Sequence, residues 1–176
     1  MDSLLKQHMR PLENRIALLE YLGELFREIS GIKTLKYRRQ RKQLDDKISI
    51  IRNSNPWFTE ESIYRAISIW GESLEPGKIH QWLSPYNLGS QKTESKNAMV
   101  IMAGNIPLVG FHDFICTIIS GNRFIGKLSS RDNILFPLVQ KWIIDYDPEW
   151  GKYIFLTSDF KSEADCVIAT GSNNTS

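Results

Sequence analysis

Apolar residues recur at helix spacing through the first part of the chain. One series ends before Gly31, where a helix C-cap is expected, and a second follows Thr59, whose hydroxyl can cap a helix N-terminus. Asn55-Pro56 interrupts the pattern between them. Pro76-Gly77 is expected to close the second helix, with a short helical piece after it. The two series are Leu12, Ile16, Leu19, Leu22, Phe26 and Ile29, followed by Ile63, Ile67, Trp70 and Leu74.

A different pattern begins after the polar stretch 84–96. A short, continuous apolar run at 98–102 predicts a strand buried on both faces, and further strands are expected at 123–128, 153–156 and 166–169. Helices are expected at 111–120 and from a cap at Asp132 to Asp147-Pro148, with a turn at Gly121-Asn122. This alternation is typical of an α/β protein with a parallel, doubly wound sheet. We therefore divide the chain into a mainly helical region, 1–95, and a sheet region, 96–176.

Composition narrows the class of protein only modestly. The 176 residues are 41% hydrophobic and 24% charged, as in globular proteins, and a net charge of +2 gives no reason to expect nucleic acid as a partner. The longest apolar stretch, 98–119, contains Asn105, Pro107, His112 and Asp113, so no membrane span is expected. No signal peptide is recognisable, and two distant cysteines make neither a disulfide framework nor a metal site. A reducing cytoplasm is the expected location.

The ends of the expected strands hold the residues that could carry chemistry. Asn105 follows the first strand, Lys127-Leu128-Ser129-Ser130 ends the second, and Thr170-Gly171-Ser172 follows the fourth. The carboxyl ends of parallel strands meet at one edge of a sheet, where doubly wound proteins bind ligands. A glycine there lets the backbone approach a pyrophosphate, and neighbouring N–H groups and hydroxyls can bind it.

In these segments the chain is similar to aldehyde dehydrogenases. Asn105-Ile106-Pro107-Leu108 resembles their Asn-Phe-Pro-Leu segment, Gly121-Asn122 with Lys127 resembles their Gly-Asn turn and following lysine, and Thr170-Gly171-Ser172 resembles their phosphate turn. The wider stretch 98–137 resembles one branch of that superfamily, the fatty acyl-CoA reductases of the bacterial bioluminescence type. The resemblance extends from about Asn55 to Ser176 and is weak before that.

The resemblance implies a Rossmann-like dinucleotide-binding domain, only part of which lies in 96–176. It implies that cofactor contacts come from Lys127, Ser129, Ser130, Arg131 and Thr170-Gly171-Ser172, with no metal. Ser130 stands where the broader family often has a glutamate that binds the adenosine ribose. Loss of that carboxylate removes repulsion against a 2′-phosphate, and Arg131 adds attraction, which favours NADPH over NADH while leaving NADH possible.

The implied reaction is reduction of an acyl thioester, on coenzyme A or an acyl carrier, to a fatty aldehyde. A cysteine thiolate forms an acyl-enzyme that accepts hydride from NADPH. Asn105 corresponds to the oxyanion donor of the family, and such a donor is worth about 3 kcal/mol in the transition state. The chain stops at Ser176, before the segment that carries the family's nucleophile. It is therefore expected to be an inactive N-terminal part without the catalytic domain. A sheet cut there would leave an exposed edge, which argues against a natural end.

Structural roles compete with each functional interpretation. Cys116 is expected to pack in a helix and Cys166 in a buried strand, where thiols are inert. Asn105 could instead cap the next helix, and Lys127 could be a solvated strand-end lysine. His112 and Asp113 are adjacent on a helix, so a catalytic dyad is not expected and His112 should be a surface or packing residue.

Two larger features have similar alternatives. The basic run Lys33–Lys47 is expected to be a solvated helix face, or else a contact for coenzyme A phosphates, an acyl carrier or an acidic partner. Four aromatic residues of the helical region are expected to pack in the core, or else to line an acyl-chain groove. They are Trp57, Phe58, Trp70 and Trp82.

Two rival functions remain open. One is another oxidoreductase of the superfamily, acting on an aldehyde or an acyl phosphate. The other is a non-catalytic scaffold or partner-binding module. The chain could also form a homo-oligomer or bind a partner subunit.

Overall fold

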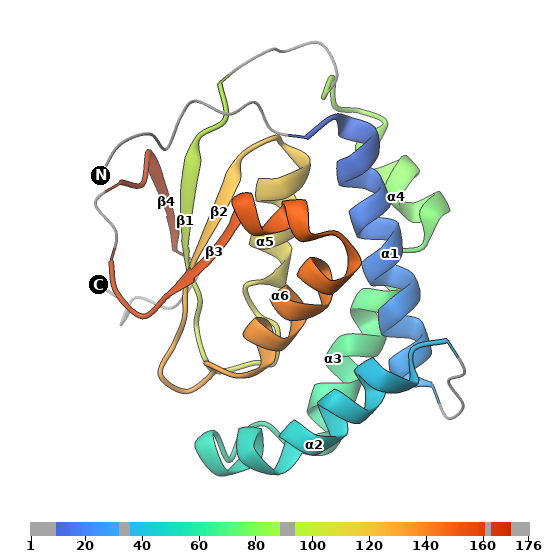
Figure 1. The fold of residues 1–176 in the computed structure, drawn as a ribbon, viewed down its shortest axis with the longest axis vertical. Coiled ribbons are helices and arrows are strands. Elements are labelled where there is room, and N and C mark those ends of the chain that lie inside the picture. Colours follow the sequence, from blue (N-terminus) through green and yellow to red (C-terminus); the bar gives the residue numbers. More distant parts are fainter. Residues whose placement is uncertain (1–9, 32–35, 89–93, 161–162, 170–176) are drawn as a thin grey trace.

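The computed structural model describes residues 10–31, 36–88, 94–160 and 163–169. Figure 1 shows a layer of helices beside one sheet. The helices are α1 (Leu12–Ser30), α2 (Arg38–Ser54), α3 (Glu60–Ser73), α4 (Pro76–Leu83), α5 (Phe111–Ile119) and α6 (Leu135–Tyr146), with a 3-10 turn η1 (Pro148–Lys152). The strands are β1 (Asn97–Ile101), β2 (Arg123–Lys127), β3 (Ile154–Thr157) and β4 (Cys166–Ala169).

The four strands are all parallel and lie in the order β3-β2-β1-β4. The chain moves from β1 to β2 to β3 in one direction and then returns to the other side of β1, where Ala98 to Ile101 pair with Cys166 to Ala169. The expected α/β class with a parallel sheet is therefore confirmed. All the described helices lie on one side of the sheet (Figure 1).

Alternation along the strands gives the sheet two different faces. Val100, Phe124 and Ile154 belong to the core shared with the helices. Phe124 packs with Phe114 and Phe136, with ring centroids 5.1 to 5.5 Å apart, so that α5, α6 and β2 meet in one aromatic cluster. The opposite face carries a cross-strand row of apolar residues, namely Phe155, Ile125, Met99 and Val167.

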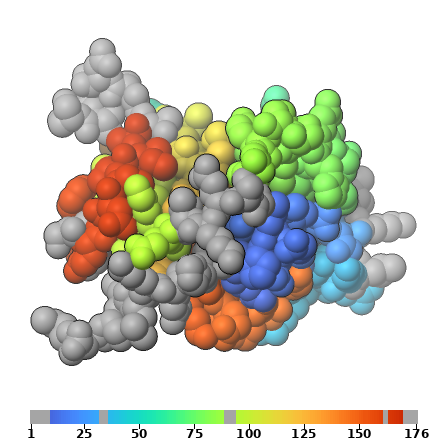
Figure 2. Space-filling view, turned by 90° about the horizontal axis from the view of Figure 1, so that it is seen from above, coloured from blue at the N-terminus to red at the C-terminus, as the bar shows by residue number. Residues whose placement is uncertain are grey.

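Helices α1 and α3 form as the apolar spacing predicts. Buried residues of α1 and α3, including Leu22, Phe26, Ile63 and Ile67, join the core that reaches the sheet. The hydroxyl of Thr59 accepts a bond from Ser62 N at 3.1 Å, which confirms the expected cap of α3. Figure 2, viewed from above, shows the green segment of α4 beside the blue helix α1.

A buried arginine joins α1 to the end of α5. Arg15 Nη1 donates to Ile119 O at 2.5 Å, one of the carbonyls that a helix C-terminus leaves without an intrahelical partner. The chain then turns at Gly121, whose φ of 86° is in the region that favours glycine. The predicted Gly121-Asn122 turn is thus confirmed, and Arg15 packs over it.

Three local expectations were wrong. Pro76 does not close α3 but is the first residue of α4, where its missing N–H costs no hydrogen bond. Trp57 is 68% exposed and so does not pack in the core, whereas Phe58 is fully buried. Trp70 and Trp82 are partly buried and pack against the core. Strand β4 lies at the sheet edge, so Cys166 is exposed rather than buried.

Within the described ranges, no helix is both long enough and apolar enough to cross a membrane.

Candidate functional site

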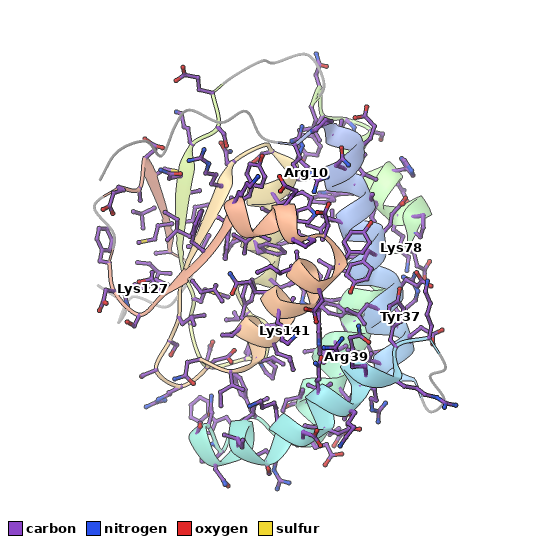
Figure 3. The ribbon with its side chains drawn as sticks, in the orientation of Figure 1. Arg10, Tyr37, Arg39, Lys78, Lys127 and Lys141 are labelled. Atoms are coloured by element: carbon purple, nitrogen blue, oxygen red, sulfur yellow. The ribbon has the colours of Figure 1, made fainter. Side chains whose placement is uncertain are left out.

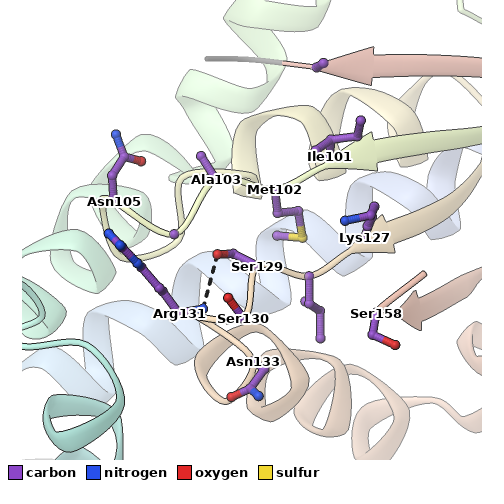
Figure 4. Close-up of a pocket in the computed structure, with 13 residues that line it drawn as sticks. Ile101, Met102, Ala103, Asn105, Lys127, Ser129, Ser130, Arg131, Asn133 and Ser158 are labelled. Carbon is purple, nitrogen blue, oxygen red and sulfur yellow. Dashed lines mark hydrogen bonds between the residues drawn. The ribbon is translucent and has the colours of Figure 1, made fainter. Parts of the chain in front are cut away.

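A cleft of about 840 Å³ opens at the carboxyl ends of the strands (Figure 4). It contains five of the residues singled out in the sequence, which are Asn105, Lys127, Ser129, Ser130 and Arg131. The remaining wall is formed by Ile101, Met102, Ala103, Gly104, Leu128, Asn133, Ser158 and Ala169. Thr170, Gly171 and Ser172 lie outside the described residues, directly after Ala169.

The strand order explains where the cleft lies. The connection after β1 leads toward α5 and β2, whereas β4 lies on the other side of β1. In open parallel sheets, such a reversal of strand order leaves a crevice beyond the carboxyl ends. Lys127 is the last residue of β2 and pairs with Ile101 at the end of β1. The register of β1 and β2 therefore places Ile101 and Lys127 side by side where the cleft begins.

Close packing holds the loops after β1 and β2 together. A Cβ added to Gly104 would lie 2.5 Å from Ser129 Oγ and 3.0 Å from Arg131 Cβ, so only glycine allows this approach. Ser129 Oγ accepts a bond from Arg131 N at 3.2 Å, and Ser129 O accepts one from Asp132 N at 3.1 Å. Ser129 therefore shapes the loop, whereas Ser130 and Arg131 are exposed on it.

The charged side chains of the described cleft wall are all cationic. Lys127 and Arg131 line it, and no aspartate or glutamate is among the described lining residues. Figure 3 shows Lys127 at the sheet, apart from Arg39 and Lys141, which lie on the helices. Within the described part of the chain, the Lys127 ammonium has no carboxylate within ion-pair distance. A cleft of this composition favours an anionic ligand.

A buried carboxyl group supports the loop from behind the cleft. Asp132 Oδ1 accepts a bond from Leu135 N, the first residue of α6, at 3.4 Å. The expected capping role is thus present, although the residue that precedes the helix is Ile134. Burial raises the pKa of Asp132 to about 6, partly offset by backbone N–H bonds that lower it. Its charge therefore changes just below neutral pH.

Asn105 lies at the far end of the cleft from Lys127 (Figure 4). Its side chain is exposed and makes no hydrogen bond with the described residues, while Pro107 and Leu108 beyond it are buried. Leu108 has a φ of 59°, so the backbone turns sharply before α5. The residue preceding α5 is Gly110, without a side-chain cap, so the alternative in which Asn105 caps that helix is wrong.

Asn55 supports the cleft wall through a contact that the sequence pattern does not predict. Asn55 follows α2, is only 3% exposed, and donates from Nδ2 to Gly104 O at 2.7 Å. The contact joins residues 49 positions apart. Local periodicity carries no information about residues that far apart. The sequence therefore indicates only that Asn55-Pro56 interrupts the helical pattern, and it does not predict the contact.

His112 and Asp113 of α5 do not form a hydrogen-bonded dyad, although the His112 ring lies 3.8 Å from Cys116 Sγ. His112 Nδ1 and Asp113 Oδ1 are 3.8 Å apart, which is beyond hydrogen-bond distance, and the His112 side chain is 64% exposed. His112 is therefore a surface residue, as expected. Cys116 is half-buried, and burial together with Asp113 raises the pKa of its thiol. Among the residues that the structure describes, no three His, Cys, Asp or Glu side chains are grouped to hold a metal.

The described part of the basic run forms an exposed face of α2. Lys42 pairs with Asp46, and Arg41 pairs with Asp45 while its guanidinium lies over the Tyr64 ring. Arg41 also donates to Ile29 O at 2.6 Å, near the end of α1. The expected solvated face is confirmed for Lys42, whereas Arg41 is half-buried. Arg38, Arg39 and Lys47 are exposed, so contact with an anionic partner stays a prediction.

Comparisons of the chain with protein-family models, with curated proteins and with solved structures gave no match. The family resemblance therefore rests on the motif residues.

Proposed function

We propose that the cleft is part of a dinucleotide-binding site with a preference for NADPH. The observation that carries this proposal is the pair Lys127 and Arg131 in a described wall without carboxylates, at the carboxyl end of a parallel sheet. The strand order supports it, because β3-β2-β1-β4 corresponds to the first four positions of the Rossmann-like order 3-2-1-4-5-6.

Each cleft residue has a role that its position allows. Lys127, at the end of β2, can donate to ribose hydroxyls or meet a phosphate. Arg131 and Ser130 are exposed on the same loop, where a guanidinium and a hydroxyl can bind a 2′-phosphate. Ser129 holds the loop through its bond from Arg131 N. Thr170, Gly171 and Ser172 would add backbone N–H groups and hydroxyls for the pyrophosphate.

The proposed parent reaction is reduction of an acyl thioester to a fatty aldehyde in the cytoplasm, with this chain as the cofactor-binding part. The thioester would be carried by coenzyme A or an acyl carrier. Bound NADPH would supply the hydride. Asn105 offers an amide donor that is free of hydrogen bonds to the described residues, as an oxyanion donor must be before substrate binds. Cys116 does not suit the role of nucleophile, because it is not among the described residues that line the cleft and burial raises the pKa of its thiol.

Calorimetric titration with NADPH and NADH tests the proposal. Arg131→Ala should weaken NADPH binding about tenfold, the loss of one exposed charge-assisted contact of about 1.4 kcal/mol, and change NADH binding less than about twofold. Lys127→Met should weaken both. Arg39→Ala, exposed on α2, is the matched control and should change neither.

Two results would contradict the cofactor assignment. One is a folded chain that binds neither nucleotide. The other is an Arg131→Ala variant that loses NADPH and NADH affinity equally, since the 2′-phosphate is the only difference between them.

A second candidate function, a partner-binding module without catalysis, is favoured by exposed apolar side chains on β3 and β4, the two outer strands of the described sheet. Phe155 is 37% and Val167 46% exposed, whereas Ile125 and Met99, which lie between them in the same row, are buried. Exposed apolar patches mark interaction sites. Failure to bind either nucleotide by a chain with an intact sheet would support this alternative.

A further inference from the structure

The polar groups of Asn55 are bonded to nearby residues, except for the side-chain Nδ2, which bonds to Gly104 in the cleft wall. Its backbone N donates to Ile51 O and its backbone O accepts from Phe58 N, both at 2.9 Å. Its Oδ1 accepts from Trp57 N at 3.2 Å. The remaining polar group is Nδ2, which donates to Gly104 O at 2.7 Å.

These contacts fix the orientation of the amide. A flipped Asn55 would place Oδ1 against the Gly104 carbonyl and Nδ2 against the N–H of Trp57, so both bonds would become repulsive. The side chain is buried, where a polar group left without a partner costs more than it does in water. The bond from Asn55 Nδ2 therefore holds the Gly104 carbonyl in one defined position.

The Gly104 peptide is also constrained from the other side. Its Cα faces Ser129 and Arg131 so closely that a Cβ would be 2.5 Å from Ser129 Oγ. Asn55 on one side and the loop after β2 on the other thus hold the same peptide. The next residue is Asn105, whose own side chain makes no bond to the described residues and so depends on the backbone for its position.

We propose that Asn55 is a positioning residue, which sets the Gly104-Asn105 segment against the Ser129–Arg131 loop and so gives the cleft its binding shape. Asn55 lies outside the cleft wall and acts through the Gly104 carbonyl. The inference rests on the proposed nucleotide site for its ligand, but the contact itself can be tested without one.

Asn55→Asp is the diagnostic variant, because it keeps the shape and changes only the donor. An ionised aspartate presents an oxygen to Gly104 O and repels it, whereas a protonated aspartate can donate as Nδ2 does. We use NADP⁺ as the probe because it tolerates acid. An aspartate at this position would be buried against a carbonyl oxygen, and both effects raise its pKa above the ordinary value. Affinity for NADP⁺ should therefore fall at least tenfold at pH 8 and recover toward that of the unmodified chain as the pH is lowered to 5.5.

Asn53→Asp is the matched control. Asn53 lies two residues earlier, is exposed, and acquires the same charge without facing the cleft. It should match the unmodified chain at both pH values. Recovery at low pH in Asn55→Asp alone ties the loss of affinity to the negative charge at residue 55. Unshifted α6 amides at pH 8 separate positioning from general damage to the fold.

Backbone ¹⁵N–¹H spectra provide the readout that needs no ligand. In Asn55→Asp at pH 8 the amides of Gly104, Asn105 and Ser129 should shift, and those of α6 should not. If the unmodified chain binds no NADP⁺, the proposed function fails and these shifts alone decide the role of Asn55. Should Asn55→Asp not fold at pH 8, Asn55→Ala is measured by the same affinity and amide criteria. Unmoved Gly104 and Asn105 amides, or unchanged NADP⁺ affinity at pH 8, would overturn the proposal.

Discussion

Replacement of Asp132 by asparagine should stabilise the protein at neutral pH. The side chain is buried behind the cleft loop, and burial raises the pKa of Asp132 from 3.8 to about 6. Each unit of difference between folded and unfolded pKa corresponds to about 1.4 kcal/mol. Holding the ionised carboxylate in the folded state at pH 7.5 therefore costs about 3 kcal/mol, while an asparagine Oδ1 can still accept from Leu135 N.

The pH dependence has a definite sign. Because the folded pKa is raised, the stabilising effect of protonation is fully present below pH 3.8 and is lost as pH rises through about 6. Asp132→Asn should therefore exceed the unmodified chain in free energy of unfolding by about 1 kcal/mol at pH 4.5 and by about 3 kcal/mol at pH 7.5. Both values follow from the two pKa values alone.

Urea denaturation at pH 4.5, 5.5 and 7.5 measures the difference directly. Asp159→Asn is the control, because Asp159 is exposed and the same substitution there should change stability little at any pH. The reasoning would be refuted by a stability difference that does not change between pH 4.5 and 7.5, or by an Asp132→Asn variant that is less stable at pH 7.5. The second result would mean that the carboxylate is stabilised by the loop more than it is penalised by burial.

Three further predictions concern other parts of the chain. Arg15→Met should lower the free energy of unfolding by about 1 to 3 kcal/mol in urea, because it leaves the Ile119 carbonyl without its donor, whereas the exposed Arg39→Met should be neutral. Thr59→Ala should cost about 1 kcal/mol through loss of the α3 cap, and no change in the urea midpoint would remove that role. With iodoacetamide at pH 7.5, mass spectrometry should find Cys166, which is exposed, modified before Cys116, whose pKa is raised; the reverse order would contradict the structure.

Most of the elements could be predicted because their signals are local. The expected strands 98–102 and 123–128 match β1 and β2 to within one residue at each end, and both strands lie inside the sheet and are largely buried. The Thr59 cap and the Gly121 turn followed from the chemistry of single residues. Five of the predicted residues, Asn105, Lys127, Ser129, Ser130 and Arg131, line one cleft because a parallel sheet brings its carboxyl ends together.

The wrong predictions concern residues whose burial or contacts depend on the tertiary structure. The run at Cys166–Ala169 reads like a buried strand, but the strand order places it at the sheet edge. Trp57 is apolar and lies in the helical region, yet it stands in the loop between α2 and α3, where it is exposed. The bond from Asn55 to Gly104 joins two regions that the sequence treats separately, so no local pattern could have revealed it.

The central claim is that the cleft at the strand ends binds a nucleotide through its cations. Titration of the ¹⁵N-labelled 176-residue chain with NADPH, followed by backbone amide shifts, tests it most directly. We expect saturable shifts at Lys127, Ser129, Ser130 and Arg131, with none along the exposed basic face of α2. Shifts confined to α2, or no saturable shifts at the cleft, would contradict the claim.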